Sequence, residues 1–402
     1  MPITVRKLKN LGHLALAIGA NAAYRFPSRG LTIIGVTGTD GKTTTSNLIY
    51  HILRKAGIKA AVITTIGAEI DGTLYDTGFH VTTPSSFSIQ KYINIAKKKG
   101  CTHLVLEVTS HALDQNRVWG IKFDVGVLTN ITREHLDYHK NYSAYVDAKL
   151  RLFKRSKVSI INSNGVWFER VVQAIPKKNL ISYSLHGENN DDLSIINLPF
   201  QIKTKLIGNF NLENIIAASA AAITLGIDPI LIDEAVQDFE APIGRQQIVG
   251  VKNGPLVMVD FAHTSNSFAN ILPEIRKKTA GKLIHVFGAA GERDSGKRPE
   301  MGKVASFYDD IIILTSEDPR SEKYETINSD IKAGIADDKK VYEIKDRGKA
   351  IELALTIAKS GDTVVITGKG HELSINYGNC EKPWSDQEAV KRFYDVRKIK
   401  EV

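Results

Sequence analysis

The stretch that most constrains this chain is residues 35–45, GVTGTDGKTTT, which follows an apolar run at residues 31–36. Its glycines allow a tight turn that exposes backbone N–H groups, and the helix expected after it adds positive potential at its N-terminus. Lys42 can reach terminal phosphates, and the Thr43 hydroxyl suits Mg²⁺. The stretch therefore predicts a phosphate-binding loop for ATP or GTP.

The glycine spacing of this loop is a variant of the usual pattern. A strict Walker A sequence would place glycine at position 36, where this chain has valine, and the glycines instead recur every third residue. The alternative, a glycine-rich turn with a chance Gly-Lys-Thr, is disfavoured by the strand expected before it and the helix expected after it. We expect the nucleotide to contact Gly38, Thr39, Asp40, Gly41, Lys42, Thr43 and Thr44.

Composition indicates an ordinary globular protein with two or three domains, since 43% of its 402 residues are hydrophobic. The net charge of +9 comes without a long basic run, which favours small anionic substrates over nucleic acid. Cys101 and Cys380 are the two cysteines, so a disulfide framework or a cysteine zinc site is excluded. We therefore expect a cytoplasmic protein that binds no nucleic acid.

The N-terminal residues resemble a signal peptide, because Arg6, Lys7 and Lys9 precede an apolar stretch at residues 14–20. That stretch is short, and a nucleotide site needs the ATP supply inside the cell. We expect instead an amphipathic helix that packs against the following domain through one side, formed by Leu8, Leu11, Ala15, Ile18 and Ala22. No segment approaches the length of a membrane span, so no membrane partner is expected.

Apolar runs typical of buried strands alternate with helical stretches along the chain. In the first half they lie at 31–36, 60–65, 104–108, 124–128 and 158–162, and in the second half at 257–261, 283–287, 311–315, 341–344 and 364–367. This alternation predicts an α/β fold: a central P-loop domain with a mostly parallel sheet, then a C-terminal Rossmann-like α/β domain. We expect a helical segment at 1–30 and domains at 31–244 and 245–402.

Two polar residues follow strand ends of the first predicted sheet, where ligands of such sheets collect. Glu107 ends one strand and His135 comes after the end of another. Either residue alone is more often a satisfied polar group, but beside the loop they can complete a Mg²⁺ site with Thr43 and the nucleotide phosphates.

Further motifs follow in order along the chain. They lie at 82–84, 107–113 with Arg117, 129–130, 135–139, 145–153, 208–214, 244–245, 260–264, 288–299, 318–320 and 368–372. Together with the loop, this series resembles the Mur ligase family, most closely its MurE branch, which adds the third residue to the peptidoglycan stem peptide. The resemblance covers residues 31 to about 386.

The resemblance implies an ATP-dependent amide-forming ligase that works through an acyl phosphate and uses ATP and Mg²⁺. It implies that Lys42 stabilises the transferred phosphoryl group and that Thr43, Glu107 and His135 hold Mg²⁺. On composition alone Lys149 is a helix lysine whose stem packs on apolar surface. By resemblance it is carbamylated and supports a second Mg²⁺. The implied catalytic residues are Lys42, Glu107, His135 and Lys149. The implied metal ligands are Thr43, Glu107, His135 and Lys149.

The resemblance also assigns the remaining polar positions. Asn211, Asn214, Arg245, Asp260 and His263 correspond to the nucleotide side, and Thr82, Thr83, Ser110 and Arg117 to the acceptor peptide. Arg293, Asp318, Arg320, Gly368 and Glu372 correspond to the incoming amino acid. The expected partners are a UDP-muramyl peptide and meso-diaminopimelate, whose second carboxylate the fork of Arg320 can bind. A monomer is expected.

Some features depart from the family pattern. About thirty residues precede the first strand, too few for the uridine-gripping domain of a full MurE, so we expect a short form without it. Glu134 stands for Asp, Thr109 for Ser, and Glu317-Asp318 for Asp-Asn. These departures keep two alternatives open: a ligase of the folate-polyglutamate or cyanophycin type that acts on an acceptor without UDP, and a nucleotide-binding module without catalysis.

Overall fold

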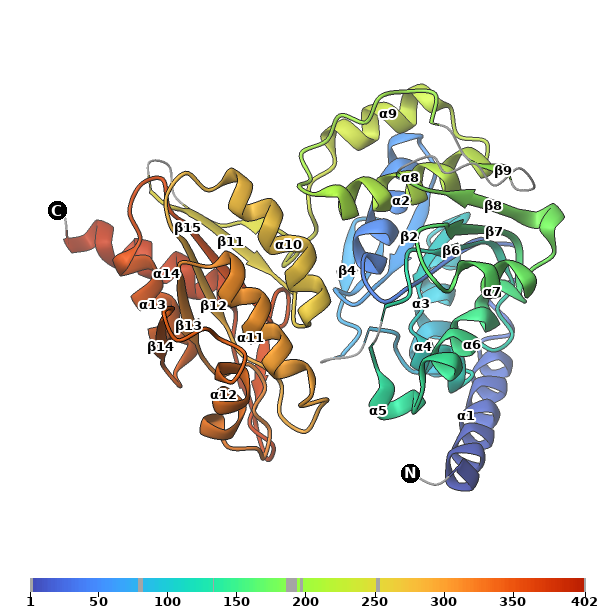
Figure 1. Ribbon diagram of the computed structural model, residues 1–402. Helices are drawn as coiled ribbons and strands as arrows, with labels where there is room; N and C mark the ends of the chain where they lie inside the picture. Colours follow the sequence, from blue (N-terminus) through green and yellow to red (C-terminus); the bar gives the residue numbers. More distant parts are fainter. Residues whose placement is uncertain are drawn as a thin grey trace. The chain divides into compact units, whose positions relative to one another are not determined.

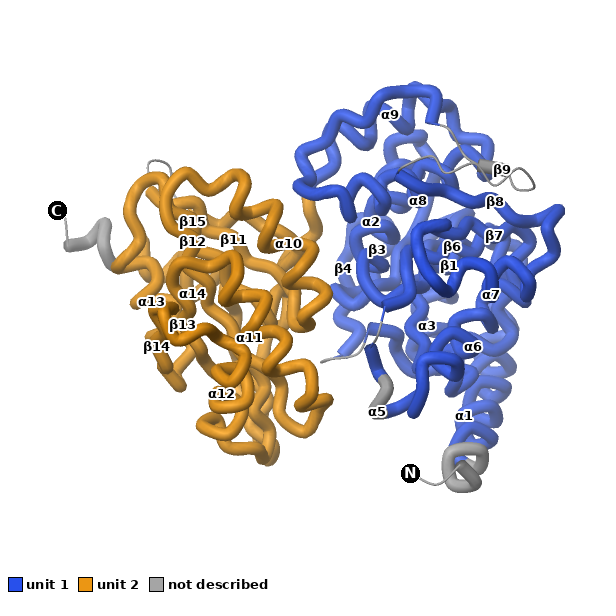
Figure 2. Tube along the Cα trace, in the orientation of Figure 1, with its two compact units in different colours: residues 1–240 blue, residues 241–402 orange. Residues whose placement is uncertain are grey.

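The computed structural model describes residues 3–78, 82–132, 134–185, 194–195, 198–250 and 254–400. Its chain forms two compact units, Met1–Glu240 and Ala241–Val402 (Figure 2). The domain bounds expected from the sequence, 31–244 and 245–402, stay a prediction.

Unit 1, residues 1–240, contains a sheet with the strand order β4-β3-β2-β5-β1-β6-β7-β8-β9 in the part of the chain that is described. The β2–β3 and β3–β4 pairs are antiparallel and the others are parallel. The strands are β1 (Thr32–Thr37), β2 (Ala60–Ile63), β3 (Ala68–Ile70), β4 (Thr73–Tyr75), β5 (His103–Glu107), β6 (Phe123–Leu128), β7 (Ser156–Asn162), β8 (Leu180–Tyr183) and β9 (Ser194–Ile195). The expected mostly parallel sheet is confirmed.

Helices cover both faces of this sheet (Figure 1). They are α1 (Ile3–Ala23), α2 (Lys42–Lys55), α3 (Ser86–Lys98), α4 (Ser110–Asp114), α5 (Leu136–His139), α6 (Tyr142–Phe153), α7 (Phe168–Gln173), α8 (Asn209–Thr224) and α9 (Pro229–Asp238), with a 3₁₀ turn, η1, at Lys177–Asn179. Ile33 joins α3 and α6 residues in one core, and α2 packs against α8. Strands buried on both faces explain the continuous apolar runs in the sequence.

The packing expected for α1 is wrong. Ala17, Ala20 and Asn21 are buried, whereas Leu11, Ala15, Ile18 and Ala22 are exposed. The Asn21 side-chain amide donates hydrogen bonds to the Ala17 and Trp119 carbonyls, both at 2.8 Å, which fixes the buried side of the helix. Leu8 lies outside the residues whose side chains are described. Among the described helices none is long and apolar enough to cross a membrane.

Unit 2, residues 241–402, has a second sheet with the order β10-β11-β15-β12-β13-β14 among its described residues, parallel except for β10. Its strands are β10 (Gln247–Ile248), β11 (Leu256–Asp260), β12 (Leu283–Phe287), β13 (Ile311–Leu314), β14 (Lys340–Glu343) and β15 (Thr363–Thr367), followed by the hairpin β16 (Ser374–Asn376) and β17 (Glu381–Pro383). Its helices are α10 (Ser265–Lys278), α11 (Lys297–Tyr308), α12 (Tyr324–Lys332), α13 (Arg347–Ile357) and α14 (Asp386–Lys400). The expected second α/β unit is confirmed.

Candidate active site

The phosphate-binding loop joins β1 to α2 in unit 1. Gly41 has a φ of 79°, a conformation that favours glycine. A Cβ on Gly38 would lie 1.8 Å from Thr129 Oγ1, so the loop backbone lies directly against the end of β6. Thr44 is buried on the first turn of α2. This is the strand, tight turn and helix that the sequence predicts.

Thr129 and Asn130, which follow β6, hold the loop in this shape. Thr129 Oγ1 donates to the Asp40 carbonyl at 2.6 Å, and Asn130 Oδ1 accepts from the Asp40 N–H at 2.9 Å. The Thr39 N–H donates to the Asn130 carbonyl at 3.0 Å. The sequence places both residues at a strand end but gives them no role, so this support was missed.

Two further predicted residues brace the loop from α8. Asn214 Oδ1 accepts from Thr45 Oγ1 at 3.2 Å and would lie 2.1 Å from a Cβ on Gly41. Asn214 Nδ2 donates to Asn211 Oδ1 at 3.1 Å. The structure therefore brings Asn211 and Asn214 to the loop, and their contact with a nucleotide stays a prediction.

Thr43 and Glu107 meet directly at the start of α2. Thr43 Oγ1 lies 3.0 and 3.2 Å from the two carboxylate oxygens of Glu107, which is 1% exposed. The backbone N–H and hydroxyl of Thr65 donate to the same carboxylate, each at 3.1 Å. Thr65 was missed because it meets Glu107 only through the pairing of β2 with β5.

The Thr43 and Glu107 pair fits Mg²⁺, which prefers oxygen ligands and usually completes its shell with phosphates and water. Among the described residues no cluster of three or more His, Cys, Asp or Glu side chains could hold a metal by itself. The pair therefore suits a metal that arrives with a nucleotide, and His135 as a nitrogen ligand stays a prediction.

His135 and Lys149 are joined through Tyr145. The His135 ring centroid lies 6.1 Å from that of Tyr145, and Lys149 Nζ lies 4.5 Å from the Tyr145 centroid. His135 has a φ of 56°, an uncommon conformation for a residue other than glycine. The Tyr145 hydroxyl lies 2.9 Å from Thr39 Oγ1, so both residues connect to the phosphate-binding loop.

Lys149 is 1% exposed, on α6, and its Nζ donates to the Gly38 carbonyl at 2.6 Å. Burial lowers the pKa of this amine well below its usual value, and the charge of Lys42 lowers the pKa further, while Asp40 partly opposes the shift. Lys42 itself donates from Nζ to the Thr39 carbonyl at 2.7 Å. The loop thus has two amines, and burial favours the neutral form of Lys149.

The residues expected to bind the acceptor gather beside the end of β5. Thr83 Oγ1 donates to the Glu107 carbonyl at 3.1 Å, and Arg117 Nη1 donates to the Thr83 carbonyl at 2.6 Å. Ser110 Oγ lies 3.0 Å from Nε2 of the buried His139. Thr82 is partly exposed beside this cluster.

In unit 2, three predicted nucleotide residues gather at the end of β11. Asp260 accepts hydrogen bonds from the Gln246 and Ala262 N–H groups at 2.7 and 2.6 Å. The Arg245 guanidinium lies 4.3 Å from the Phe261 ring centroid, and His263 Nδ1 lies 2.8 Å from the Phe261 carbonyl. Arg245, Asp260 and His263 therefore share one edge of the second sheet.

A buried lysine without a predicted role holds two of the residues that are expected to bind the amino acid. Lys369 is 0% exposed and pairs with Asp318 at 2.8 Å and with Glu372. Burial alone would lower the pKa of this amine, but Glu372 and Asp318 together raise it. Asp318 and Glu372, the carboxylates expected to contact the amino acid, therefore already pair with a lysine of the chain. The Gly-Lys-Gly sequence at 368–370 was the feature of the sequence that could have indicated this lysine.

Arg320 is partly exposed at the same edge, with a φ of 53°. Its Nη1 donates to the Gly291 carbonyl at 3.1 Å. Glu322, two residues further along the chain, pairs with Arg298. Arg293 is exposed.

Glu317 is buried beside Gly368, and its Oε2 has no hydrogen-bond partner in the part of the chain that is described. Burial raises the pKa of this carboxyl to about 7. Nearby, the buried Arg347 donates to the Ser316 and Thr367 carbonyls and to Asp386. Gly368 has a φ of 104°, so the backbone beside Glu317 needs glycine.

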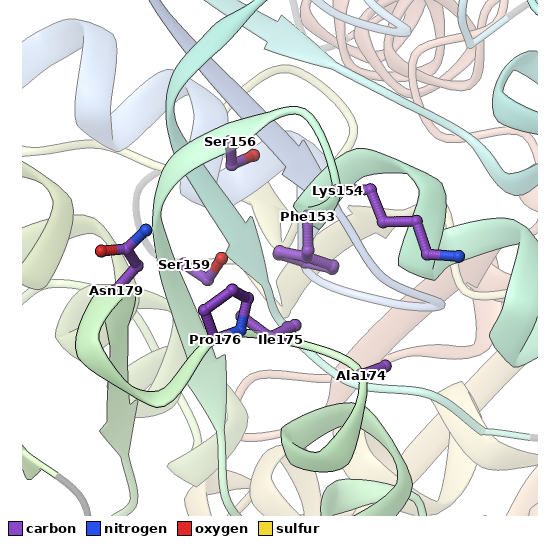
Figure 3. Close-up of a pocket in the computed structure, with 8 residues that line it drawn as sticks. All are labelled: Phe153, Lys154, Ser156, Ser159, Ala174, Ile175, Pro176 and Asn179. Carbon is purple, nitrogen blue, oxygen red and sulfur yellow. The ribbon is translucent and has the colours of Figure 1, made fainter.

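A pocket of about 270 Å³ lies elsewhere in unit 1 (Figure 3). Ser156, Ser159 and Pro176 are among its lining residues. Since β7 begins at Ser156 and runs parallel to β6 and β1, this pocket lies toward the amino ends of the strands, away from the phosphate-binding loop. It contains none of the predicted site residues.

Comparison with known proteins agrees with this arrangement. Residues 36–222 match the Mur ligase middle domain and residues 244–370 the Mur ligase, glutamate ligase domain. A UDP-N-acetylmuramoyl-L-alanyl-D-glutamate--2,6-diaminopimelate ligase from Aquifex aeolicus is 40% identical over 94% of this chain and 80% of its own length.

Solved structures are also similar. A UDP-N-acetylmuramoyl-L-alanyl-D-glutamate--2,6-diaminopimelate ligase has a TM-score of 0.64 and 32% identity over 94% of this chain and 82% of its own. A Mycobacterium tuberculosis folylpolyglutamate synthase has a TM-score of 0.73 but 15% identity, over 88% of this chain and 92% of its own. At that identity the second likeness concerns the fold alone.

The fold and the phosphate-binding loop, with its paired Thr43 and Glu107, define a P-loop nucleotide-binding protein with two α/β units. The chain belongs to the Mur ligase family, as its motifs indicate. It is therefore an ATP-dependent amide ligase.

Proposed function

We propose that this enzyme joins an amine of meso-diaminopimelate to the terminal carboxylate of a UDP-N-acetylmuramoyl dipeptide, with ATP as the phosphoryl donor, in peptidoglycan synthesis. Eight relatives that are 34–40% identical have the name of this reaction, which supports the substrate pair. We also propose that it acts as a monomer inside the cell, where ATP is available.

The observation that carries this proposal is the buried Lys149 beside Lys42. A loop that only binds or hydrolyses a nucleotide needs one lysine on the phosphates. A second, buried amine with a lowered pKa has a different use, because a neutral amine can add CO₂ and become a carbamate anion. This property favours the ligase over a nucleotide-binding module.

In the first step the acceptor carboxylate attacks the γ-phosphorus of ATP, a new O–P bond forms, and the bond to the ADP oxygen breaks. Lys42 and the loop N–H groups stabilise the charge on the transferred group. Arg117 and Ser110, near the end of β5, position the acceptor. Arg245, Asp260 and His263 are proposed to contact the nucleotide.

Thr43, Glu107 and His135 would hold Mg²⁺, with carbamylated Lys149 for a second ion, and the metal supplies positive charge that neutralises the phosphates. The hydroxyl and carboxylate of Thr43 and Glu107 already lie within 3.2 Å of each other. This distance requires little movement of the chain when the nucleotide binds.

In the second step the amine of the amino acid attacks the acyl phosphate, a C–N bond forms, phosphate leaves and the amine loses a proton. Arg320 is proposed to bind the distal carboxylate of diaminopimelate. Asp318 adds a negative charge here compared with the family's Asn, but Lys369 pairs with it, so the repulsion expected for a bound carboxylate is reduced. Arg293, Gly368 and Glu372 would complete this site.

Phosphate release from ATP, measured with panels of acceptors and amino acids, tests the proposal. We expect turnover that requires both the UDP-muramyl dipeptide and meso-diaminopimelate, with an amide product detected by mass spectrometry. A folate or other acceptor without UDP that supports equal turnover would favour the other branch of the superfamily, and turnover independent of both partners would contradict ligation.

A further inference from the structure

From Leu11 to Ala23 the face of α1 that points away from unit 1 is apolar. Leu11, Leu16 and Ile18 are 62%, 55% and 43% exposed. Gly12, Ala15, Gly19, Ala22 and Ala23 are exposed on the same helix. From Leu11 to Ala23 the sequence contains no Asp, Glu, Lys or Arg. An exposed apolar face this long needs a partner, because isolated exposed apolar side chains are normal but continuous ones mark interaction sites.

α3 extends this face. Phe87, at the start of α3, is 43% exposed, and its ring lies 4.0 Å from the position of a Cβ on Gly19. At the other end of α3, Lys97 Nζ donates to the Arg29 carbonyl at 2.9 Å, just beyond α1. In Figure 1 α1 runs along the outside of unit 1. We call Leu11, Leu16, Ile18 and Phe87 the apolar face.

The charged residues of the segments that form the apolar face have one sign. Residues 3–29 and 86–99 contain no acidic residue, and their basic residues are Arg6, Lys7, Lys9, Arg25, Arg29, Lys91, Lys97, Lys98 and Lys99. Without these nine, the 53 basic residues of the chain become 44, equal to its 44 acidic residues. The whole net charge of +9 therefore lies on two helices and the turn after the first.

The apolar face lies between two of these basic groups. Lys9 is exposed before Leu11, and Arg25 and Arg29 are exposed after α1, beside Lys97. An apolar strip with cations at both ends fits an anionic lipid surface, where apolar side chains enter the acyl boundary and cations meet phosphate headgroups. Two copies of the same strongly cationic face would repel each other, which disfavours a dimer through α1.

We infer that the apolar face of α1 and α3 binds the surface of an anionic membrane and holds the enzyme there as a peripheral protein. The helix lies on the bilayer and does not cross it. This inference departs from the sequence-based expectation of no membrane partner, which was based on the length of the apolar segments and did not consider a helix that lies on the surface. It does not depend on which amide the enzyme forms.

Sedimentation of the full chain with vesicles tests the inference. We expect binding to vesicles of phosphatidylcholine and phosphatidylglycerol in equal parts, weak binding to phosphatidylcholine alone, and release at high salt. Leu11→Glu with Ile18→Glu should abolish binding. The matched control is Val166→Glu with Ile230→Glu, two exposed apolar residues elsewhere in unit 1, and it should bind like the wild type.

A second pair separates charge from apolar contact. Lys97→Gln with Lys98→Gln should weaken binding about 25-fold, since each cation near an anionic surface contributes a factor of about five. Lys177→Gln with Lys178→Gln, adjacent exposed lysines just before β8, should change nothing. All the side chains replaced in these variants are exposed. Thermal unfolding midpoints check that each variant folds.

Three results would overturn the inference. The first is that the wild type fails to sediment with vesicles that contain phosphatidylglycerol. The second is that the Leu11 and Ile18 double variant binds these vesicles as well as the wild type does. The third is that the wild type does not bind vesicles and forms a dimer in analytical ultracentrifugation, whereas the double variant is a monomer. This result would assign the apolar face to a second copy of the chain.

Discussion

Two lysines are fully buried beside the predicted sites of the two units, and they differ in their partners. Lys149 in unit 1 donates to a backbone carbonyl, and among the described residues no carboxylate pairs with it. Lys369 in unit 2 pairs with Asp318 and Glu372. Burial favours the neutral amine of Lys149, whereas two carboxylates outweigh burial and keep Lys369 charged.

This difference shows that partners, and not depth alone, decide what a buried lysine does. A neutral amine is a nucleophile that can react with CO₂, so Lys149 is suited to chemistry. A charged amine between two carboxylates fixes three side chains in one position, so Lys369 is suited to holding Asp318 and Glu372 in place. The comparison can be tested from each side.

The largest expected effect is on unit 1. Lys149→Ala should lower the ligation rate about a thousandfold, because a group that stabilises transition-state charge is removed, and ATP should still bind. Short carboxylic acids should restore part of the rate by replacing the carbamate. Lys154→Ala, an exposed lysine that follows the same helix, is the control. Full activity of Lys149→Ala without added bicarbonate or acid would remove the role of a carbamate.

The second effect concerns stability in unit 2. Lys369→Met leaves two carboxylates without their buried cation, which should lower the free energy of unfolding by about 3–5 kcal/mol. Urea unfolding measures the change, and Lys359→Met, an exposed lysine, should have almost no effect. A loss below about 1 kcal/mol would mean that Lys369 does not hold the cluster together.

The third effect is a pH dependence from Glu317. Its pKa of about 7 in the folded chain exceeds the ordinary 4.5, so the folded state holds the proton more tightly. Its contribution to stability is complete below about pH 4.5 and lost as the pH rises through about 7, by at most about 3 kcal/mol. Glu317→Gln should flatten this fall in unfolding curves, and the exposed Glu352→Gln should not. Identical pH profiles for wild type and Glu317→Gln would refute the assignment.

The smallest effect is on specificity. If Lys369 neutralises Asp318, Arg320 is available for the distal carboxylate, and Arg320→Ala should reduce the preference for diaminopimelate over lysine about tenfold, the value of a hydrogen bond to a charged group. Ligation rates with the two amino acids measure it, with Arg392→Ala on α14 as the control. If the wild type uses lysine as fast as diaminopimelate, the proposal that Arg320 selects diaminopimelate is wrong.

Much of the fold follows from the sequence, because buried parallel strands give continuous apolar runs. The strand expected at 283–287 is β12, and that expected at 124–128 begins one residue earlier as β6. The hairpin of β3 and β4 was missed, since its strands are three residues long and β4 is partly exposed. The exposed face of α1 was predicted wrongly because residues 11–23 are apolar except for His13 and Asn21, and Asn21 lies on the buried side, so hydrophobic periodicity does not identify the packed face.

The site was predictable where a motif carries its own chemistry. The loop residues and Glu107 follow from the glycine pattern and a strand end. The contact of Thr65 with Glu107 and that of Lys369 with Asp318 do not, because the partners are 42 and 51 residues apart in sequence, respectively. Such contacts depend on strand register and strand order, which the sequence of a single chain does not show.

Arg347 connects the second unit's site to the order in which the chain is made. Its guanidinium joins the carbonyls of Ser316 and Thr367 to Asp386, which follows the last strand of unit 2. Before the ribosome adds Asp386, this buried cation lacks its carboxylate. Unit 1, complete by residue 240, can fold during synthesis, whereas the residues proposed to bind the amino acid reach their final arrangement last.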